Sequence, residues 1–357
     1  MSKTYTYKPD SVSFPGETLA DLLQERNLTQ AELAKRMDVT PKHINEIING
    51  KASITAEMSL RLERVLGTPA EFWNERERQY QECVAKRNEA KRLADYEDWV
   101  KLFPLKELYV QGWISEKKAS VKSIQELLSF FQISNPEKHV DIWNQFAVNY
   151  KRQKSFTSHF HSTTTWLQQG RHLAQQQSTK PFDEKRFLSA IQEMRTLIPE
   201  MHDDFAKRLV AISAEAGVAL VFTPALPKTR VYGATHWLSP EKAVIQLSLR
   251  GKRDDYFWFT LFHEVGHILK HGKRDVFLEG IENESQKEIE ANRFAADFLI
   301  PPQEWANFTS ITPFTKPRII DFAKSLRISP GIVAGRLQHE SKDFSKFNDL
   351  KVVIGFE

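Results

Sequence analysis

The 357-residue chain contains a single cysteine, Cys83, and only a small excess of positive charge. One thiol excludes an intramolecular disulfide and a zinc site built from cysteines, so any metal must be held by histidine and carboxylate side chains. Such cysteine usage is typical of a reducing compartment, and we expect a cytoplasmic protein. Because the net charge is only +4, nucleic-acid binding would require a local basic patch.

Long apolar runs are also missing. The N-terminal residues contain no apolar signal-peptide core, and the most apolar stretch, residues 209–226, is interrupted by Glu215 and Pro224. We therefore expect neither an export signal nor a membrane-spanning helix. The residues that are abundant suit folded domains, since 41% are hydrophobic and 27% are charged. A chain of this length exceeds one ordinary domain.

Residues 14–80 contain the helix start and stop signals of a small helical domain. Thr29 and Glu32 show the spacing of a capping box, and Thr40 followed by Pro41 is a typical helix start. Five short helices are predicted in this segment. The second and third would form a helix-turn-helix.

The segment from PGETLADLLQ to GTPAEFW resembles the XRE/Cro-type helix-turn-helix of HigA-like antidote proteins. In such folds the second helix of the motif enters the major groove of double-stranded DNA. We place six exposed polar side chains at this interface, with base edges reached by Thr40, Lys42, His43 and Asn45 and phosphates by Gln30 and Lys51. The alternative is a unit used only for protein contact or dimerisation, because Glu46 and neighbouring acids dilute the positive charge.

The strongest chemical signal is HEVGH, residues 263–267, within FTLFHEVGHILKH. His263 and His267 stand at i and i+4, so they project from one helical face and can share a metal. Bound Zn²⁺ lowers the pKa of a water ligand to roughly 7, which allows the adjacent Glu264 to act as general base. The apolar neighbours predict a buried helix, where an unpaired cluster would be costly. The alternative is an ordinary helix that matches the pentapeptide by accident.

A third ligand is offered by the segment EIEANRFAADFLIP. Glu288 is followed one turn later by Asn292, whose amide can orient a zinc histidine, whereas Glu290 is followed by an aromatic residue. We therefore assign Glu288 to the metal, with Asn292 as its outer partner, and keep Glu290 as the alternative. Asp275 and Asp297 are weaker candidates.

His271 lies one turn beyond His267 and is a possible third histidine ligand. With Gly272 it has the features of a helix C-terminus, where an imidazole interacts well with the last carbonyls, and we prefer this structural interpretation. Zinc rather than manganese is itself an inference, because a His/His/Glu set suits several divalent metals.

Together, FTLFHEVGHILKH and EIEANRFAADFLIP resemble the ImmA/IrrE family of gluzincin-like metallopeptidases, with weaker similarity over about residues 182–340. The resemblance implies that His263, His267 and Glu288 hold zinc and that Glu264 is the base. It also implies cleavage of a protein substrate, often a transcriptional repressor.

An extended substrate needs a strand to pair with, and the apolar run at residues 243–249 is the expected one. Three polar side chains lie near it in the sequence, Tyr232, His236 and Arg250. Each suits an ordinary surface or supporting role, and none is assigned to catalysis.

Residues 323–330 repeat the pattern of residues 34–41, including the N-cap and the proline of a second helix. The chain thus contains a second helix-turn-helix-like element. Small residues, Gly331, Ala334 and Gly335, stand where the first copy has polar and charged ones. They favour close helix packing over the reading of bases.

The predicted fold is mainly α with a smaller α+β part. Four regions are expected: a helix-turn-helix domain (1–80), a helical, aromatic-rich middle (81–181), a metallopeptidase-like domain with a small β-sheet and the second helix-turn-helix-like element (182–340), and a C-terminal tail (341–357). The predicted protein is a homodimeric DNA-binding transcriptional regulator with a zinc endopeptidase that cleaves a repressor or antitoxin-type protein. One alternative is a HigA-like antitoxin that binds a cognate toxin through the peptidase fold. Another is a sensor that binds a small ligand.

Overall fold

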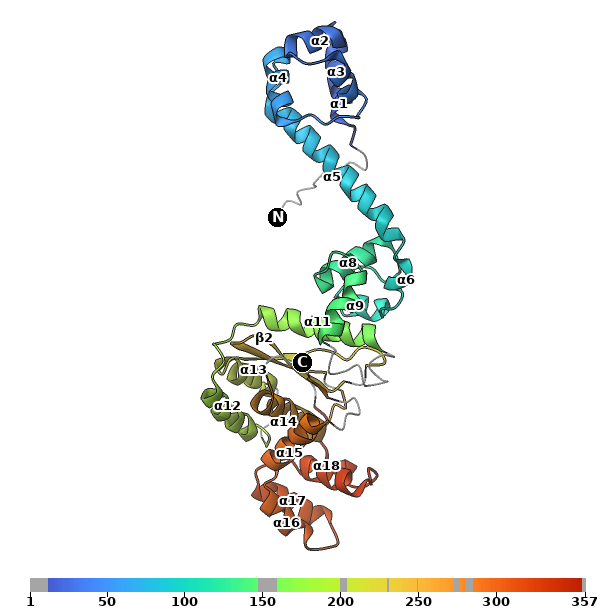
Figure 1. Cartoon of the computed structure of the whole chain (residues 1–357). Coiled ribbons are helices and arrows are strands. Elements are labelled where there is room, and N and C mark those ends of the chain that lie inside the picture. The colour runs from blue at the N-terminus through green and yellow to red at the C-terminus, as the bar shows by residue number, and fades with distance from the viewer. Residues whose placement is uncertain are drawn as a thin grey trace. The chain divides into compact units, whose positions relative to one another are not determined.

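The computed structural model describes residues 12–146, 159–199, 204–229, 231–248, 250–272, 277–279 and 285–354. They form mainly helices and one small sheet, which confirms the predicted fold class (Figure 1). The chain divides into two compact units, residues 1–97 and residues 98–357. The boundaries expected at residues 80, 181 and 340 stay predictions. None of the helices in the described ranges has the length and apolar character that crossing a bilayer requires.

The first unit contains five helices, as the sequence predicts. They are α1 (Pro15–Glu25), α2 (Gln30–Met37), α3 (Pro41–Ile48), α4 (Ala56–Leu66) and α5 (Ala70–Ala94). The side chains of Thr29, Thr40 and Thr55 accept hydrogen bonds from backbone amides in the first turns of α2, α3 and α4. The expected capping box of Thr29 and Glu32 is present. Local side chains therefore fix where these helices begin.

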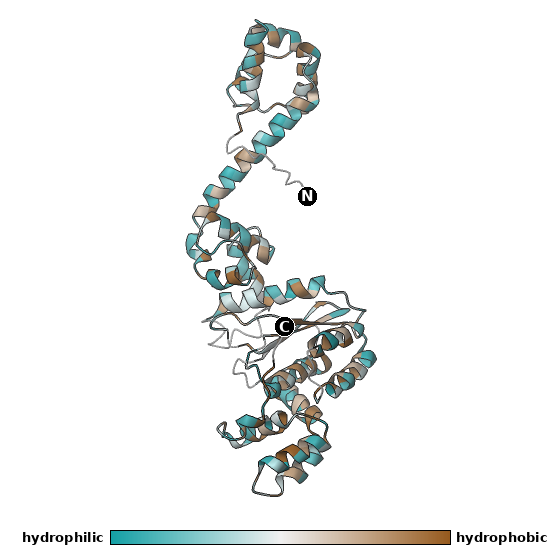
Figure 2. Ribbon diagram, turned by 180° about the vertical axis from the view of Figure 1, so that it is seen from behind, coloured by the Kyte–Doolittle hydropathy of each residue, from teal (hydrophilic) through white to brown (hydrophobic). Residues whose placement is uncertain are grey.

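The inward faces of the five helices share one apolar core. Leu33, Ile44, Ile47 and Trp73 are at most 1% exposed within it. Beyond Trp73, α5 continues as a helix that is hydrophilic along most of its length (Figure 2). Because the apolar side chains of α3 face this core, its polar side chains remain on the outer side of the unit.

The second unit begins with the helices of the aromatic-rich region. They are α6 (Glu97–Val100), α7 (Leu105–Val110), α8 (Val121–Phe131), α9 (Glu137–Phe146) and α11 (Phe160–Gln176). The last of them also lies on the sheet (Figure 1): the indole Nε1 of Trp166 donates to the carbonyl of Thr223, and the amide of Gln246 donates to the carbonyl of Trp166. This helix thus connects the aromatic-rich region to the sheet.

A buried histidine, His139, and a half-buried one, His161, lie among these helices with ring centroids 5.4 Å apart. Aromatic rings surround them, including those of Trp99, Phe103 and Phe131. Nδ1 of His139 and Nε2 of His161 are buried without a hydrogen-bond partner among the described residues. Burial lowers the pKa of His139 to about 3, with His161 acting in the same direction, and burial lowers the pKa of His161 to about 4.

The sheet contains β1 (Val218–Phe222), β2 (Gly233–Ser239), β3 (Lys242–Leu247) and β4 (Phe277–Glu279), in the order β1-β3-β2-β4. β3 pairs in parallel with β1 and antiparallel with β2, and β4 pairs with the first residues of β2. The expectation that residues 243–249 pair with a substrate is therefore wrong, because both edges of β3 are already hydrogen bonded. Residue 249 of that run lies outside the described residues.

One face of the sheet carries α11, and the other is covered by α13 (Phe205–Glu215) and α14 (Asp254–Lys270), with α12 (Glu184–Thr196) packed against α13 (Figure 1). Four further helices follow: α15 (Gln286–Leu299), α16 (Pro302–Thr309), α17 (Lys316–Ser325) and α18 (Pro330–Ser341), and a short 3₁₀ helix, η1 (Asn348–Leu350), comes last. α14 contacts both α15 and α18, so it lies at the centre of this part of the molecule.

α17 and α18 form the predicted second helix-turn-helix-like element, and α18 is buried against α14. A Cβ added to Gly331 would lie 2.4 Å from a carboxylate oxygen of Asp254, and one added to Gly335 would lie 2.8 Å from a carboxylate oxygen of Asp255. The expected close packing by small residues is confirmed, and the side of α18 that corresponds to the predicted base-reading side of α3 packs against α14.

We predict that acidification destabilises the aromatic-rich region through His139 and His161. An unfolded histidine titrates near 6.5, so below that pH the unfolded chain binds protons that the folded chain binds only near pH 3 to 4. The free energy of unfolding should fall by about 2 kcal/mol for each histidine between pH 7.5 and pH 5. Urea unfolding followed by tryptophan fluorescence at both pH values measures this change.

In the variant His139→Gln, the free energy of unfolding should change less with pH than in the wild type. In His43→Gln, at a half-exposed position, it should change as much as in the wild type. An identical change of unfolding free energy in wild type and His139→Gln would contradict the prediction.

Candidate metal centre and helix-turn-helix face

The HEVGH segment lies in α14, a helix that is buried along most of its length. Asp254 and Asp255 occupy its first turn, where carboxylates are favoured by the helix dipole. Asp254 accepts hydrogen bonds from the hydroxyl of Ser329 and from the backbone amide of Val352, and Asp255 pairs with Lys351 at 2.6 Å. These contacts hold the start of the helix in place, which sets the position of the histidines three turns later.

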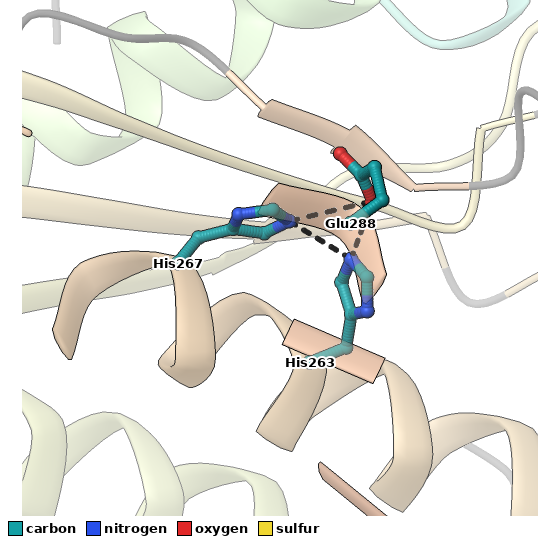
Figure 3. A group of neighbouring side chains, drawn as sticks. All are labelled: His263, His267 and Glu288. Atoms are coloured by element: carbon teal, nitrogen blue, oxygen red, sulfur yellow. Dashed lines mark hydrogen bonds and ion pairs between the residues drawn. The ribbon is translucent and has the colours of Figure 1, made fainter. Parts of the chain in front are cut away.

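Three side chains predicted to bind a metal meet at one point (Figure 3). Oε2 of Glu288, from α15, lies 3.1 Å from Nε2 of His263 and 3.5 Å from Nε2 of His267, and the two Nε2 atoms are 2.9 Å apart. All three residues are buried, at 1% exposed for each histidine and 8% for the glutamate. The three side chains thus come from two helices, and Glu288 lies at least 21 positions from either histidine in the sequence.

The other ring nitrogen of each histidine is held from outside this point. Nδ1 of His263 lies 2.9 Å from Oδ1 of Asn292, an acceptor, so Nδ1 carries the proton and Nε2 keeps its lone pair. Nδ1 of His267 lies 3.0 Å from Nδ1 of His271, whose Nε2 is 3.4 Å from a carboxylate oxygen of Glu290. If His271 donates to this carboxylate, its Nδ1 accepts from His267, and Nε2 of His267 again keeps a lone pair.

The structure separates the two competing glutamates. Glu288 lies at the histidines, while Glu290 lies at His271, on the outside of the cluster. His271 is also the C-cap residue of α14, and its backbone amide donates to the carbonyl of His267. Its contact with the imidazole of His267 is a role that our sequence reasoning missed, although the i, i+4 spacing carries the signal.

These residues fit a divalent metal in both donor type and protonation. Burial lowers the pKa of His267 to about 4, although Glu288 acts in the opposite direction. Burial raises the pKa of Glu288, but the neighbouring imidazoles of His263 and His267 outweigh it and lower the value to about 2. At neutral pH His267 is therefore a neutral imidazole and Glu288 a carboxylate, the forms that bind a metal. Two imidazoles and one carboxylate match the protein ligands of an open catalytic zinc site.

Glu264 is 0% exposed and lies where β2 crosses α14. A Cβ added to Gly233 would lie 2.5 Å from Oε1 of Glu264 and 2.8 Å from Cγ2 of Thr260. The hydroxyl of Thr235, two residues along β2, donates to the backbone carbonyl of Glu264 at 3.1 Å. Glycine at position 233 thus leaves the space that the Glu264 carboxylate occupies.

The remaining polar candidates lie elsewhere. His236 is buried, and burial lowers its pKa to about 3, with Arg171 of α11 acting in the same direction. Alternation along β2 places it on the face opposite Gly233 and Thr235. Asp297 is not part of the group of potential ligands found among the described residues. Asp275 lies outside those residues.

The predicted DNA-contacting residues gather around the start of α3. The hydroxyl of Thr40 caps this helix by accepting from the amide of His43. The Lys42 side chain is 85% exposed, and its ammonium lies 3.8 Å from a carboxylate oxygen of Glu46. The amide of Asn45 donates to Oε1 of Gln30 on α2 at 3.2 Å. Lys51 is exposed in the segment that follows α3. The structure thus places all six on or beside the outer side of the helix-turn-helix.

We predict that the protein binds one divalent ion per chain through Glu288 and not through Glu290. Elemental analysis of protein purified without chelators and supplied with zinc measures the content. The ion should be lost in His263→Ala and in Glu288→Ala, because each removes one of three ligands, and retained in Glu290→Ala. Circular dichroism checks that the variants are folded. A metal-free wild type, or a Glu288→Ala variant that keeps its ion, would overturn the assignment.

Two family models match this chain. Residues 19–73 match a helix-turn-helix model, and residues 214–338 match a peptidase family model described as the IrrE N-terminal-like domain. The second match contains α14, α15 and the four strands.

Similar proteins cover the N-terminal region. An uncharacterised HTH-type transcriptional regulator, YddM, of Escherichia coli is 32% identical over 59 residues, which are 16% of this chain and 63% of that protein. The virulence-associated protein I of Dichelobacter nodosus is 42% identical over 60 residues, 16% of this chain and 56% of that protein. This chain therefore spans less than two thirds of these curated relatives. A solved addiction module antidote protein of the HigA family from Coxiella burnetii is 31% identical, with 23% of this chain and 91% of that chain covered and a TM-score of 0.22.

The helices α2 and α3 fall within the first matched region, and the converging His263, His267 and Glu288 fall within the second. The chain thus combines a region that matches a helix-turn-helix model with a region that matches the peptidase family model described as the IrrE N-terminal-like domain.

Proposed function

We propose that the protein is a DNA-binding transcriptional regulator whose second unit is a zinc-dependent endopeptidase acting on a regulatory protein. The observation that carries the proposal is the convergence of His263 Nε2, His267 Nε2 and Glu288 Oε2 at one buried point, with Glu264 on the same helix. The match to a peptidase family model over residues 214–338 supports it.

Bound zinc supplies a Lewis acid that polarises a peptide carbonyl and makes water a better nucleophile. The chain itself supplies the ligands and the proton acceptor. Asn292 and His271 hold the two imidazoles with their Nε2 lone pairs toward the metal position. Glu264 would accept a proton from the attacking water as the new C–O bond forms, and would deliver it to the leaving amine as the C–N bond breaks.

The proposed substrate is a repressor or an antitoxin-type protein, and the proposed compartment is the cytoplasm. Peptide hydrolysis consumes only water, so the reaction needs no redox cofactor. β4 stands at the end of the strand order β1-β3-β2-β4. In place of β3, it is the strand near the metal position with which an extended substrate would pair. The ring of Phe277 in β4 stacks on His267 with centroids 4.0 Å apart, which places this strand beside the ligands.

The proposed partner of the first unit is double-stranded operator DNA, bound by a homodimer. α3 would lie in the major groove, with Thr40, Lys42, His43 and Asn45 toward base edges. Gln30 and Lys51 would contact phosphates. The helix-turn-helix match supports this role, as does the naming of one relative as a transcriptional regulator.

We predict that Glu264→Gln abolishes proteolysis while the metal and DNA binding remain. Losing a general base should slow cleavage by at least about 100-fold. Wild type and variant, both loaded with zinc, are incubated with a cell lysate, and new protein N-termini are identified by mass spectrometry. Glu304→Gln, an exposed position on α16, is the matched control and should cleave as wild type does.

Equal sets of new N-termini from wild type and Glu264→Gln would show that the mechanism is wrong. If no preparation cleaves, and a neighbouring toxin forms a stoichiometric complex that survives Glu264→Gln, the antitoxin alternative replaces the peptidase proposal.

We predict that Lys42→Ala and Asn45→Ala each lower affinity for specific DNA by about tenfold, because each removes a base-edge contact. Lys51→Ala should weaken binding equally for all sequences, since a phosphate contact carries no sequence information. Fluorescence anisotropy at one fixed salt concentration, with duplexes from upstream of the gene, measures these effects. Lys91→Ala on α5 is the control. Unchanged affinity in both Lys42→Ala and Asn45→Ala would contradict the proposed interface.

A further inference from the structure

A cavity opens beside the first two turns of α14, and the lining residue nearest to Glu264 on this helix, Thr260, lies about one turn before it. It encloses about 310 Å³, including its open mouth, and its lining is basic and aromatic. Tyr256 and Thr260 line it from the helix, and Tyr232 lines it from the segment that enters β2. The two tyrosine rings stack with centroids 5.7 Å apart and planes 5° apart. The cavity therefore has an aromatic wall on the helix that carries the proposed metal ligands.

Three cations, Arg250, Lys252 and Arg253, also line this cavity. In the part of the chain that the structure describes, none of them forms an ion pair with a carboxylate. Arg250 donates to the carbonyl of Thr229 and Arg253 donates to the side-chain oxygen of Asn348, both neutral acceptors. The guanidinium of Arg250 also lies 5.5 Å from the ring centroid of Tyr232. Their positive charge is thus left uncompensated at the mouth of the cavity.

The nearby acidic side chains do not neutralise these cations, because they are engaged elsewhere. Asp255 pairs with Lys351 at 2.6 Å, and Asp254 accepts from Ser329 and from the backbone of Val352. Both carboxylates are buried, whereas Lys252 and Tyr256 are exposed. A ligand that enters the cavity would meet the cations and the aromatic wall first.

The cavity is aligned with the proposed proton acceptor. Tyr256, Thr260 and Glu264 recur every four residues and form one stripe of α14, and Gly233 of β2 packs against both Thr260 and Glu264. Tyr256 lies eight residues of helix, or about 12 Å, from Glu264, and an extended peptide advances about 3.4 Å per residue. A substrate held at Glu264 would therefore reach the tyrosines with a side chain within about four residues of the bond that is cleaved.

We propose that this cavity binds an acidic side chain of the protein substrate and makes the peptidase selective for glutamate or aspartate near the cleaved bond. The methylene stem would pack on the stacked tyrosines, and the carboxylate would meet Arg250 and Lys252. This inference rests on the proposed function, because it names the substrate class of that same site.

The test measures binding without cleavage. Full-length Glu264→Gln protein is titrated into two fluorescein-labelled peptides, one alternating alanine with glutamate and one alternating alanine with glutamine, and anisotropy is followed. The glutamate peptide should bind more tightly. Arg250→Gln and Lys252→Gln, each added to this background, should lower its affinity by about tenfold, since each removes a charge-assisted contact. Arg250→Lys keeps the charge and should retain most of the binding.

Lys207→Gln on α13, an exposed lysine away from the cavity, is the matched control, and circular dichroism shows whether each variant is folded. The proposal is overturned if both peptides bind equally, if neither binds, or if the cavity variants bind the glutamate peptide as tightly as the control does. It is also overturned if these variants lose affinity for a DNA duplex and not for the peptide, because the cavity would then hold nucleic-acid phosphates.

The same reagents separate this inference from the proposed function. If the acidic peptide binds in the cavity but the wild type cleaves nothing, the cavity proposal is retained and the proposed peptidase function is rejected. If the wild type cleaves acidic and neutral sites equally well, and the cavity variants do not change this, the function stands and the cavity proposal falls.

Discussion

Burial of α14 is the constraint on which the rest of the second unit depends. The helix carries two histidines and a glutamate into a region with almost no contact with water. Unpaired polar groups are costly there, so each ring nitrogen must have a partner. Asn292 and His271 satisfy the outer nitrogens, which leaves the inner ones directed at Glu288. A cation at that point would compensate the inner lone pairs, so the same burial that makes the cluster costly when empty favours metal binding.

The burial of α14 also explains the second helix-turn-helix-like element. The start of α14 carries two adjacent carboxylates, and both have partners among residues 329–352. This requires α18 to approach within contact of the helix, which only small residues allow. The glycines that replace the polar residues of the first copy are therefore a consequence of supporting the metal helix. One local pattern serves two roles, because α3 keeps its polar side exposed while α18 buries the corresponding side.

Features set by neighbouring residues could be predicted from the sequence, and features set by long-range packing could not. Helix starts at Thr29, Thr40 and Thr55 follow from side chains that bond the adjacent turn. The preference for Glu288 over Glu290 follows from helical periodicity, which also places Asn292. By contrast, periodicity identifies residues 243–247 as a strand but does not give its neighbours, so the substrate edge was misplaced on β3. The placement of α11 on the sheet depends on distant partners such as Thr223.

The division of α14 into faces links recognition to chemistry. The face toward α15 holds the proposed metal ligands, and the stripe toward β2 holds Glu264 together with Thr260 and Tyr256. Because one rigid helix carries all of these groups, a side chain seated on the Tyr256 end fixes how far the peptide backbone lies from Glu264. Binding energy gained about 12 Å along the helix from Glu264 would then orient the carbonyl that is attacked. Substrate selectivity and cleavage rate would then both depend on this one helix, without a conformational change.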